Sequence, residues 1–160
     1  MTALNIRKGV DSTVRWVLIL LMAVLVLNVI WQVFSRYVLQ SPSTFTDELA
    51  RFLMIWVSLL GAAYFSGQNA HIAIKIIPDR LSEANQKKLQ MLVYILTLVF
   101  VSVVFIAGCG YQVWLKFTFR EVAPALQISM GWVYLVGPVS GLLIAYYTIT
   151  QMIALWASSK

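Results

Sequence analysis

The run LQMLVYILTLVFVSVVFIAGCGYQVWL, residues 89–115, contains no charged residue. A helix that crosses a membrane needs about 20 mainly apolar residues, so this run is long enough to form one. Three further stretches of the chain have similar length and apolar character. We therefore predict an all-α integral membrane protein. Its single domain, residues 1–160, would have crossings at about residues 16–36, 46–67, 89–114 and 129–156, with short interfacial helical segments in the loops.

The composition agrees with this class. Of the 160 residues, 61% are hydrophobic and 11% are charged, and a soluble domain of this size cannot bury so much apolar surface. The formal net charge of +6 comes from basic residues that lie between apolar runs, which argues against a nucleic-acid partner. We expect a lipid bilayer as the surroundings. The single cysteine, Cys109, excludes an internal disulfide and lies in an apolar setting typical of packing.

The direction of the crossings follows from the basic residues of the short loops. The apolar run at residues 16–34 is too long for a signal peptide, so we interpret it as a retained crossing. With four crossings, eight of the 12 Lys and Arg residues fall on the side of the termini and the middle loop. Because cytoplasmic loops carry the excess of Lys and Arg, we predict that both termini are cytoplasmic.

The first crossing carries a polar stripe. Asn28, Gln32 and Arg36 are spaced four residues apart, so they share one helix face. The stripe can form ordinary hydrogen bonds between helices of this chain, or it can contact a protein partner. The sequence leaves both interpretations open.

The second crossing begins with the charged segment DELAR, residues 47–51. Thr44 and Asp47 have the spacing of a capping box, and acids in the first turn of a helix suit its dipole. These charges can therefore simply cap and solvate the helix end. Alternatively, Arg36 pairs with Glu48 or Asp47 and fastens the first two crossings, or pairs with a residue of another subunit. Arg51 lies one turn after these acids.

Three residues deeper in the crossings indicate packing. Trp56 falls near the middle of the second crossing, so we expect it to pack against another helix. Gly137 and Gly141 in the fourth crossing have the spacing that permits close helix approach. Pro138 between them removes a backbone donor and is expected to kink the helix.

The last outer loop carries Lys116, Arg120 and Glu121 among aromatic residues. The loop is either a surface that contacts a partner outside the membrane or an interfacial segment with solvated charges, and both interpretations stay open.

The sequence lacks the usual signs of chemistry. No crossing carries a carboxylate, lysine or arginine deep in the bilayer, where transport pathways usually have one. His71 is the only histidine, which excludes a His-rich metal site and a bis-His haem site. We therefore expect no catalytic residue, metal or cofactor, and a subunit that supports a partner. The alternatives are a membrane anchor of another complex, such as a redox enzyme, or a small homo-oligomeric exporter.

Three stretches together resemble a known family. RYVLQSPSTFTDELARFLMIWVSLLGAAY, AHIAIKIIPDRL and ALQISMGWVYLVGP are similar to the small membrane subunit (DctQ-type) of tripartite ATP-independent periplasmic (TRAP) transporters. The similarity rests on Arg36-Tyr37, on Thr46 to Arg51, on His71-Ile72, and on Trp132-Val133-Tyr134 with Pro138. Phe45-Thr46 replaces a common Trp-Ser, and Asp47 replaces a common Glu; both changes keep the chemistry.

The resemblance implies a function. The chain would be a scaffold in the bacterial inner membrane, bound to a large multi-span subunit that carries the substrate and sodium sites. A periplasmic binding protein would deliver a carboxylate-bearing solute, such as a C4-dicarboxylate or sialic acid, and a Na+ gradient would drive its uptake. The candidate fastening residues are Asn28, Gln32, Arg36, Asp47, Glu48, Arg51, Trp56, Gly137 and Gly141. The candidate docking residues are Lys116, Arg120 and Glu121.

Overall fold

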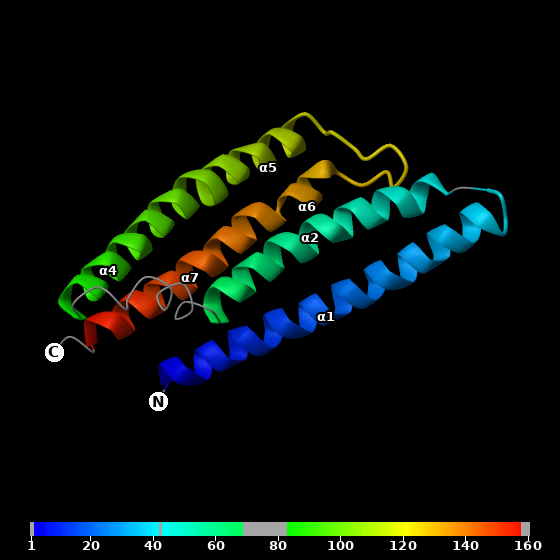
Figure 1. Cartoon of the computed structure of the whole chain (residues 1–160). Helices are drawn as coiled ribbons and strands as arrows, with labels where there is room; N and C mark the ends of the chain where they lie inside the picture. Colours follow the sequence, from blue (N-terminus) through cyan, green and yellow to red (C-terminus); the bar gives the residue numbers. More distant parts are fainter. Residues whose placement is uncertain (1, 42, 69–82, 158–160) are drawn as a thin grey trace.

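The structure is a computed structural model that describes residues 2–41, 43–68 and 83–157 (Figure 1). Within these residues the predicted all-α fold is confirmed. The helices are α1 (Thr2–Tyr37), α2 (Thr44–Gln68), α4 (Glu83–Phe100), the π-helix η2 (Val101–Gly108), α5 (Cys109–Thr118), α6 (Met130–Tyr134) and α7 (Val136–Ala157). The expectations for His71 and for the other residues of 69–82 in the middle loop lie outside the described residues.

Four helical segments are long and apolar enough to cross a membrane, as predicted. They are Arg7–Tyr37, Thr44–Gln68, Asn85–Thr118 and Met130–Ala157. The third segment joins α4, η2 and α5, and the fourth joins α6 and α7. Helix α1 begins well before Trp16, so basic and acidic residues of the N-terminal region continue the same helix into the first crossing.

The four crossings lie side by side in one layer (Figure 1). Helix α1 forms one edge and packs mainly on α2, α2 packs on α7, and α7 packs on the α4–η2–α5 segment, which forms the other edge. In the most apolar window of each crossing, 44% of the residues are buried in the fourth but none in the first. Both broad faces of the layer are therefore left to lipid or to another protein.

The contact between α2 and α7 is close because glycine lies where the helices meet. A Cβ atom added to Gly67 would lie 2.8 Å from the ring of Tyr147, a fully buried side chain. The same arrangement recurs between α7 and the third crossing. There, a Cβ atom on Gly137 would lie 2.6 Å from the Cβ atom of Cys109. Small residues thus allow the backbones of neighbouring helices to approach.

The fourth crossing is interrupted near its start. Helix α6 ends at Tyr134 and α7 begins at Val136, with Leu135 between them. Pro138 lacks a backbone N–H, and its ring collides with the carbonyl of the residue four positions earlier, which is Tyr134. The interruption at Leu135 therefore lies in the turn before Pro138, where this proline is expected to disturb the helix.

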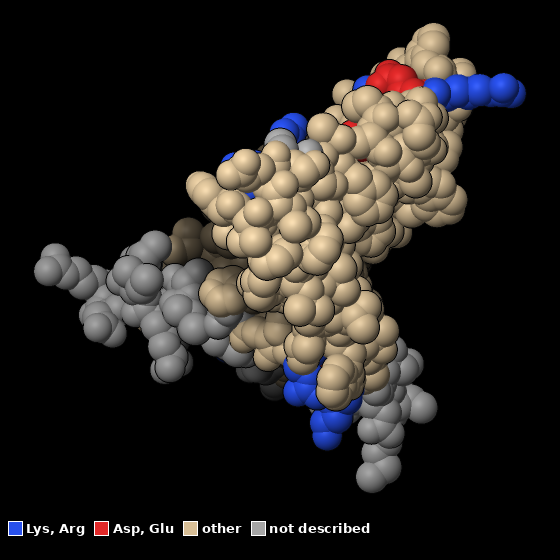
Figure 2. Space-filling model, turned by 90° about the vertical axis from the view of Figure 1, so that its right-hand side faces the viewer, with Lys and Arg blue, Asp and Glu red and all other residues tan. Residues whose placement is uncertain are grey.

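Charged side chains are distributed unevenly over the surface. Figure 2 shows a face that is mostly uncharged, with acidic residues only near its upper end and beside basic ones. This distribution suits a molecule whose apolar middle is surrounded by lipid.

Candidate functional site at the loop end

Both termini lie at one end of the layer, and two loops lie at the other (Figure 1). These are residues 38–43, between α1 and α2, and residues 119–129, between α5 and α6. We call this end the loop end and the opposite one the terminal end. The charged candidate residues lie at the loop end, and those of the segment DELAR are among them.

Glu48 joins the start of α2 to the 119–129 loop. Its Oε2 atom accepts hydrogen bonds from the backbone N–H groups of Ala125 (2.8 Å) and Leu126 (2.7 Å). Hydrogen bonds to a charged group contribute more than those between neutral groups, about 1.5–3 kcal/mol each. Glu48 therefore holds the distant 119–129 loop against the start of α2, and Arg36 is not its partner in the structure.

The 119–129 loop also has internal structure. The N–H of Ala123 donates to the carbonyl of Ile128 (2.8 Å), and the N–H of Met130 donates to the carbonyl of Glu121 (2.8 Å). Arg120 and Gln127 adopt positive φ angles of 50° and 55°. Such angles are uncommon for residues other than glycine, so the surrounding contacts must hold the loop in one conformation.

The start of α2 is capped one residue earlier than the sequence indicated. Ser43, not Thr44, precedes the first helical turn and accepts a 3.5 Å hydrogen bond from the N–H of Thr46 through its Oγ atom. The hydroxyl of Thr46 donates in return to the carbonyl of Ser43 (3.0 Å). The capping box expected at Thr44 and Asp47 is therefore wrong in register, which frees the Asp47 carboxylate for another partner.

That partner is Arg36. The guanidinium of Arg36 lies 3.7 Å from the carboxylate of Asp47, and both side chains are partly exposed. Asn28, from the same polar stripe, donates a 2.8 Å hydrogen bond to the carbonyl of Thr46. Two members of the stripe thus connect α1 to α2 within this chain. Gln32 and Arg51 line a partly polar hollow beside this ion pair.

The three candidate docking residues do not behave alike. The ammonium group of Lys116 lies 2.6 Å from the carboxylate of Glu121 and 5.5 Å from the ring centre of Tyr134. These contacts bind Lys116 and Glu121 to each other. Arg120 is exposed, and the part of the chain that the structure describes gives it no ion pair.

The other fastening residues contact helices of this chain. Gly137 and Gly141 are buried against Cys109 and Phe105 of the third crossing. Trp56 is half-buried in an apolar hollow of about 320 Å³ between α1, α2 and the start of the fourth crossing, which agrees with a packing role. Gly137 and Gly141 are therefore occupied by contacts within the chain, whereas Trp56 borders a hollow.

A second polar cluster, which the sequence interpretation missed, lies at the terminal end. The hydroxyl of Tyr147 donates to the carboxylate of Asp11 (2.7 Å). The carbonyl of Gly67, at the end of α2, accepts from Arg7 (3.0 Å) and from Gln151 (3.3 Å). The last carbonyl groups of a helix have no hydrogen-bond donor within the helix. Here, side chains from α1 and α7 donate to one of them. The available signal was Gln151, a polar residue within an apolar crossing.

The arrangement is suited to holding elements together. Among the residues that the structure describes, no three His, Cys, Asp or Glu side chains are placed to hold a metal ion. The polar side chains at both ends instead join α1, α2, α7 and the 119–129 loop.

Comparison with known proteins decides the family. The model of the family described as "Tripartite ATP-independent periplasmic transporters, DctQ component" matches residues 25–158. The chain belongs to this family. The resemblance predicted from three sequence stretches is therefore confirmed.

Individual relatives of this DctQ-family chain agree. It is 29% identical over 147 residues to the sialic acid TRAP transporter small permease protein SiaQ of Vibrio cholerae, covering 92% of this chain and 83% of the relative. It is 24% identical over 155 residues to a Haemophilus influenzae protein described as a TRAP transporter small permease, covering 93% and 88%. A third relative is the isethionate TRAP transporter permease protein DctMQ of Oleidesulfovibrio alaskensis, 29% identical over 107 residues, which cover 62% of this chain and 16% of that protein.

Proposed function

We propose that this chain is the scaffold subunit of a secondary transporter and binds a large multi-span subunit that moves the solute. The observation that carries the proposal is the open layer of helices, since the first crossing has no buried residue in its apolar window. A chain that leaves both faces uncovered has apolar surface to offer to another membrane protein. The match of this chain to 16% of the length of the relative named DctMQ supports a close association of the small and the large subunit. The chain catalyses no reaction of its own.

The transported solute is an organic anion. Sialic acid, in the name of one relative, is a carboxylate, and isethionate, in the name of another, is a sulfonate. We propose a carboxylate-bearing solute, such as a C4-dicarboxylate or sialic acid, whose uptake is driven by a Na+ gradient. The sites for solute and ion belong to the large subunit in this proposal.

The loop end faces the periplasm in this proposal, and both termini face the cytoplasm of a bacterium, in its inner membrane. The excess of Lys and Arg on the side of the termini supports this direction. A periplasmic binding protein would then meet the 119–129 loop. Arg120 is the residue proposed for this contact, because it is exposed while Lys116 and Glu121 engage each other.

Reconstituted uptake tests the scaffold function. The large subunit and the soluble binding protein are placed in vesicles with and without this chain, under an inward Na+ gradient. We expect uptake only when all three components are present, and no uptake when Na+ is replaced by K+. Full uptake without this chain, or purification of the chain free of any membrane partner, would contradict the proposal.

A further inference from the structure

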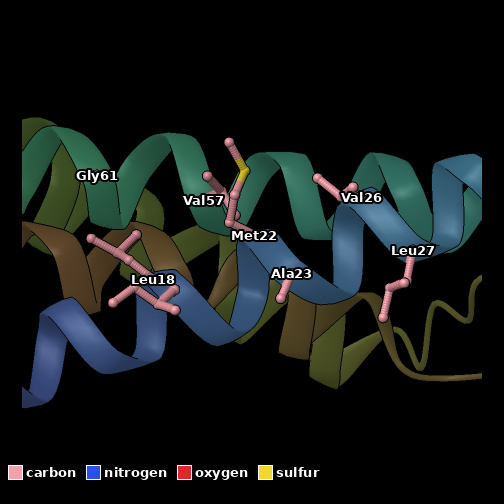
Figure 3. A pocket seen from close by; sticks show the side chains of 8 residues that line it. Leu18, Met22, Ala23, Val26, Leu27, Val57 and Gly61 are labelled. Carbon is pink, nitrogen blue, oxygen red and sulfur yellow. The ribbon is translucent and has the colours of Figure 1, made fainter.

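An apolar groove runs along one side of the α1–α2 pair. Its deeper part is a hollow of about 690 Å³ with almost entirely apolar walls. Figure 3 shows Leu18, Met22 and Val26 of α1 beside Val57 and Gly61 of α2 around this hollow. A Cβ atom added to Gly61 would meet no other atom within 4 Å, so the wall is open at this position.

The groove continues toward the loop end and becomes partly polar. A second hollow, of about 370 Å³, lies between Gln32 and Arg36 of α1 and Asp47 and Arg51 of α2. Met54 also lines this hollow, and on α2 it lies one turn from Val57 of the apolar hollow. The two hollows therefore follow each other along the same face of α2.

The polar part of the groove has an excess of positive charge. It holds two guanidinium groups, of Arg36 and Arg51, and one carboxylate, of Asp47, which leaves one positive charge in excess. The ion pair between Arg36 and Asp47 is loose, at 3.7 Å. Arg51 is exposed and has no ion pair among the described residues. Arginine side chains near the end of a crossing reach the level of the lipid headgroups, where a bound anion neutralises the excess charge.

The length of the groove fits one leaflet of a bilayer. Met22 and Arg36 are 14 residues apart on α1, which at 1.5 Å per residue is about 21 Å. Half of a bilayer, headgroups included, is about 20–22 Å thick. A ligand with its anionic group at the arginines and an apolar chain reaching Met22 thus extends from the headgroup level to the middle of the membrane.

We propose that the α1–α2 groove binds a phospholipid of net negative charge, with its phosphate at Arg36 and Arg51 and one acyl chain along Met22, Val57 and Gly61. A phosphodiester carries one negative charge, which equals the excess in the groove. Guanidinium groups bind phosphate through two parallel hydrogen bonds. The apolar walls of the deeper hollow take the chain, which a free phosphate ion lacks.

The test measures lipids retained by the full-length chain, purified from its native membrane with the subunits that remain bound. After exchange into detergent, phosphatidylglycerol or phosphatidylethanolamine is added, and native mass spectrometry counts bound lipid. We expect phosphatidylglycerol to be retained at least about tenfold better than phosphatidylethanolamine. We expect Arg51→Gln and Arg36→Gln each to reduce that retention about tenfold. Arg120→Gln removes the same charge outside the groove and should retain lipid as the unaltered chain does.

A second pair of variants tests the acyl chain. Gly61→Leu fills the open wall of the groove and should lower retention of phosphatidylglycerol. Gly110→Leu is the matched control, since a Cβ atom at Gly110 also meets nothing within 4 Å but lies in α5. Equal retention of the two lipids, or groove variants that behave as their controls do, would overturn the proposal. So would a result in which Gly61→Leu releases a bound protein subunit and leaves lipid retention unchanged, because a partner helix would then occupy the groove.

Discussion

The carboxylate of Glu48 lies 2.7 Å from the backbone nitrogen of Leu126, a residue 78 positions later in the chain. The same oxygen also accepts from the N–H of Ala125. One side chain at the start of the second crossing thus determines where the loop between the third and fourth crossings lies. Because this carboxylate accepts from two successive N–H groups of the loop, we expect the conformation of the loop to depend on it.

Replacement of Glu48 should loosen the 119–129 loop. Glu48→Ala leaves the N–H groups of Ala125 and Leu126 without their acceptor, and we expect their hydrogen exchange to become at least tenfold faster, as loss of a bond of about 1.5–3 kcal/mol requires. Glu48→Gln keeps an oxygen acceptor and should have a smaller effect. Exchange measured by mass spectrometry on the loop checks this, with Asp47→Ala as the control. Unchanged protection in Glu48→Ala would show that the loop holds itself.

The ion pair between Arg36 and Asp47 should contribute little to stability. It is 3.7 Å long and partly exposed, and exposed pairs typically contribute about 0.2–1 kcal/mol. A double-mutant cycle with Arg36→Gln and Asp47→Asn, measured by thermal unfolding in detergent, should give a coupling energy in this range. A coupling energy above about 2 kcal/mol would show that the pair is better shielded than its exposure indicates.

Gly137 should be replaceable only if Cys109 gives way. A Cβ atom at Gly137 lies 2.6 Å from the Cβ atom of Cys109, so Gly137→Ala forces two helices apart, at a cost of about 1–3 kcal/mol. Cys109→Gly removes the opposing atom, so the double variant should have a higher melting temperature than Gly137→Ala alone. Gly61→Ala meets open space and should be neutral or stabilising. Failure of Cys109→Gly to rescue Gly137→Ala would place the clash elsewhere.

The hydrogen bond between Tyr147 and Asp11 should stabilise the terminal end. Tyr147 is fully buried, and its hydroxyl donates to the Asp11 carboxylate at 2.7 Å. Tyr147→Phe keeps the packed ring and removes only this bond, so we expect a loss of about 1.5–3 kcal/mol in the free energy of unfolding. Asp11→Asn retains an acceptor and should lose less. Equal stability of Tyr147→Phe and the unaltered chain would contradict the importance of this bond.

Docking of the binding protein should depend on Arg120. Arg120→Glu reverses an exposed charge in the 119–129 loop, and we expect slower association with the soluble protein and a weaker dependence of that rate on salt. Arg15→Glu makes the same reversal at an exposed position of the terminal end and serves as the control. Binding of the soluble protein to vesicles that contain each variant measures the association rate and its dependence on salt. If Arg15→Glu alone impaired binding, the proposed orientation would be reversed.

The crossings were predictable because each needs only a long apolar run, and residues 89–115 show this without any knowledge of neighbours. Contacts between individual residues were harder to predict from the sequence. The sequence predicted that Arg36 lies near Asp47 and Glu48, because a short loop joins their helices. It did not identify the N–H groups that bind Glu48. Those groups follow Pro124 in a turn, and a turn in the last loop gives no sign of which helix it will meet.

The terminal cluster illustrates the same limit. Asp11 and Tyr147 are 136 positions apart, and no local pattern connects them. Arg7 and Gln151 meet at Gly67 only because α1 and α7 both pass the end of α2. Contacts of this kind depend on how the helices are arranged, which the apolar pattern of each helix does not determine.

The π-helix at Val101–Gly108 places extra chain in the middle of the third crossing. Its hydrogen bonds span five residues instead of the usual four, so it accommodates extra chain within the same rise. Loss of one residue there would return the segment to α-helical winding and leave the helix beyond it in the same orientation, whereas loss of one residue from α4 would turn everything after it by about 100°. Cys109 would therefore keep its contact with Gly137 after a deletion within the π-helix but would leave it after a deletion in α4. The effect of losing one residue from the longest apolar run thus depends on whether the loss falls inside the π-helix or outside it.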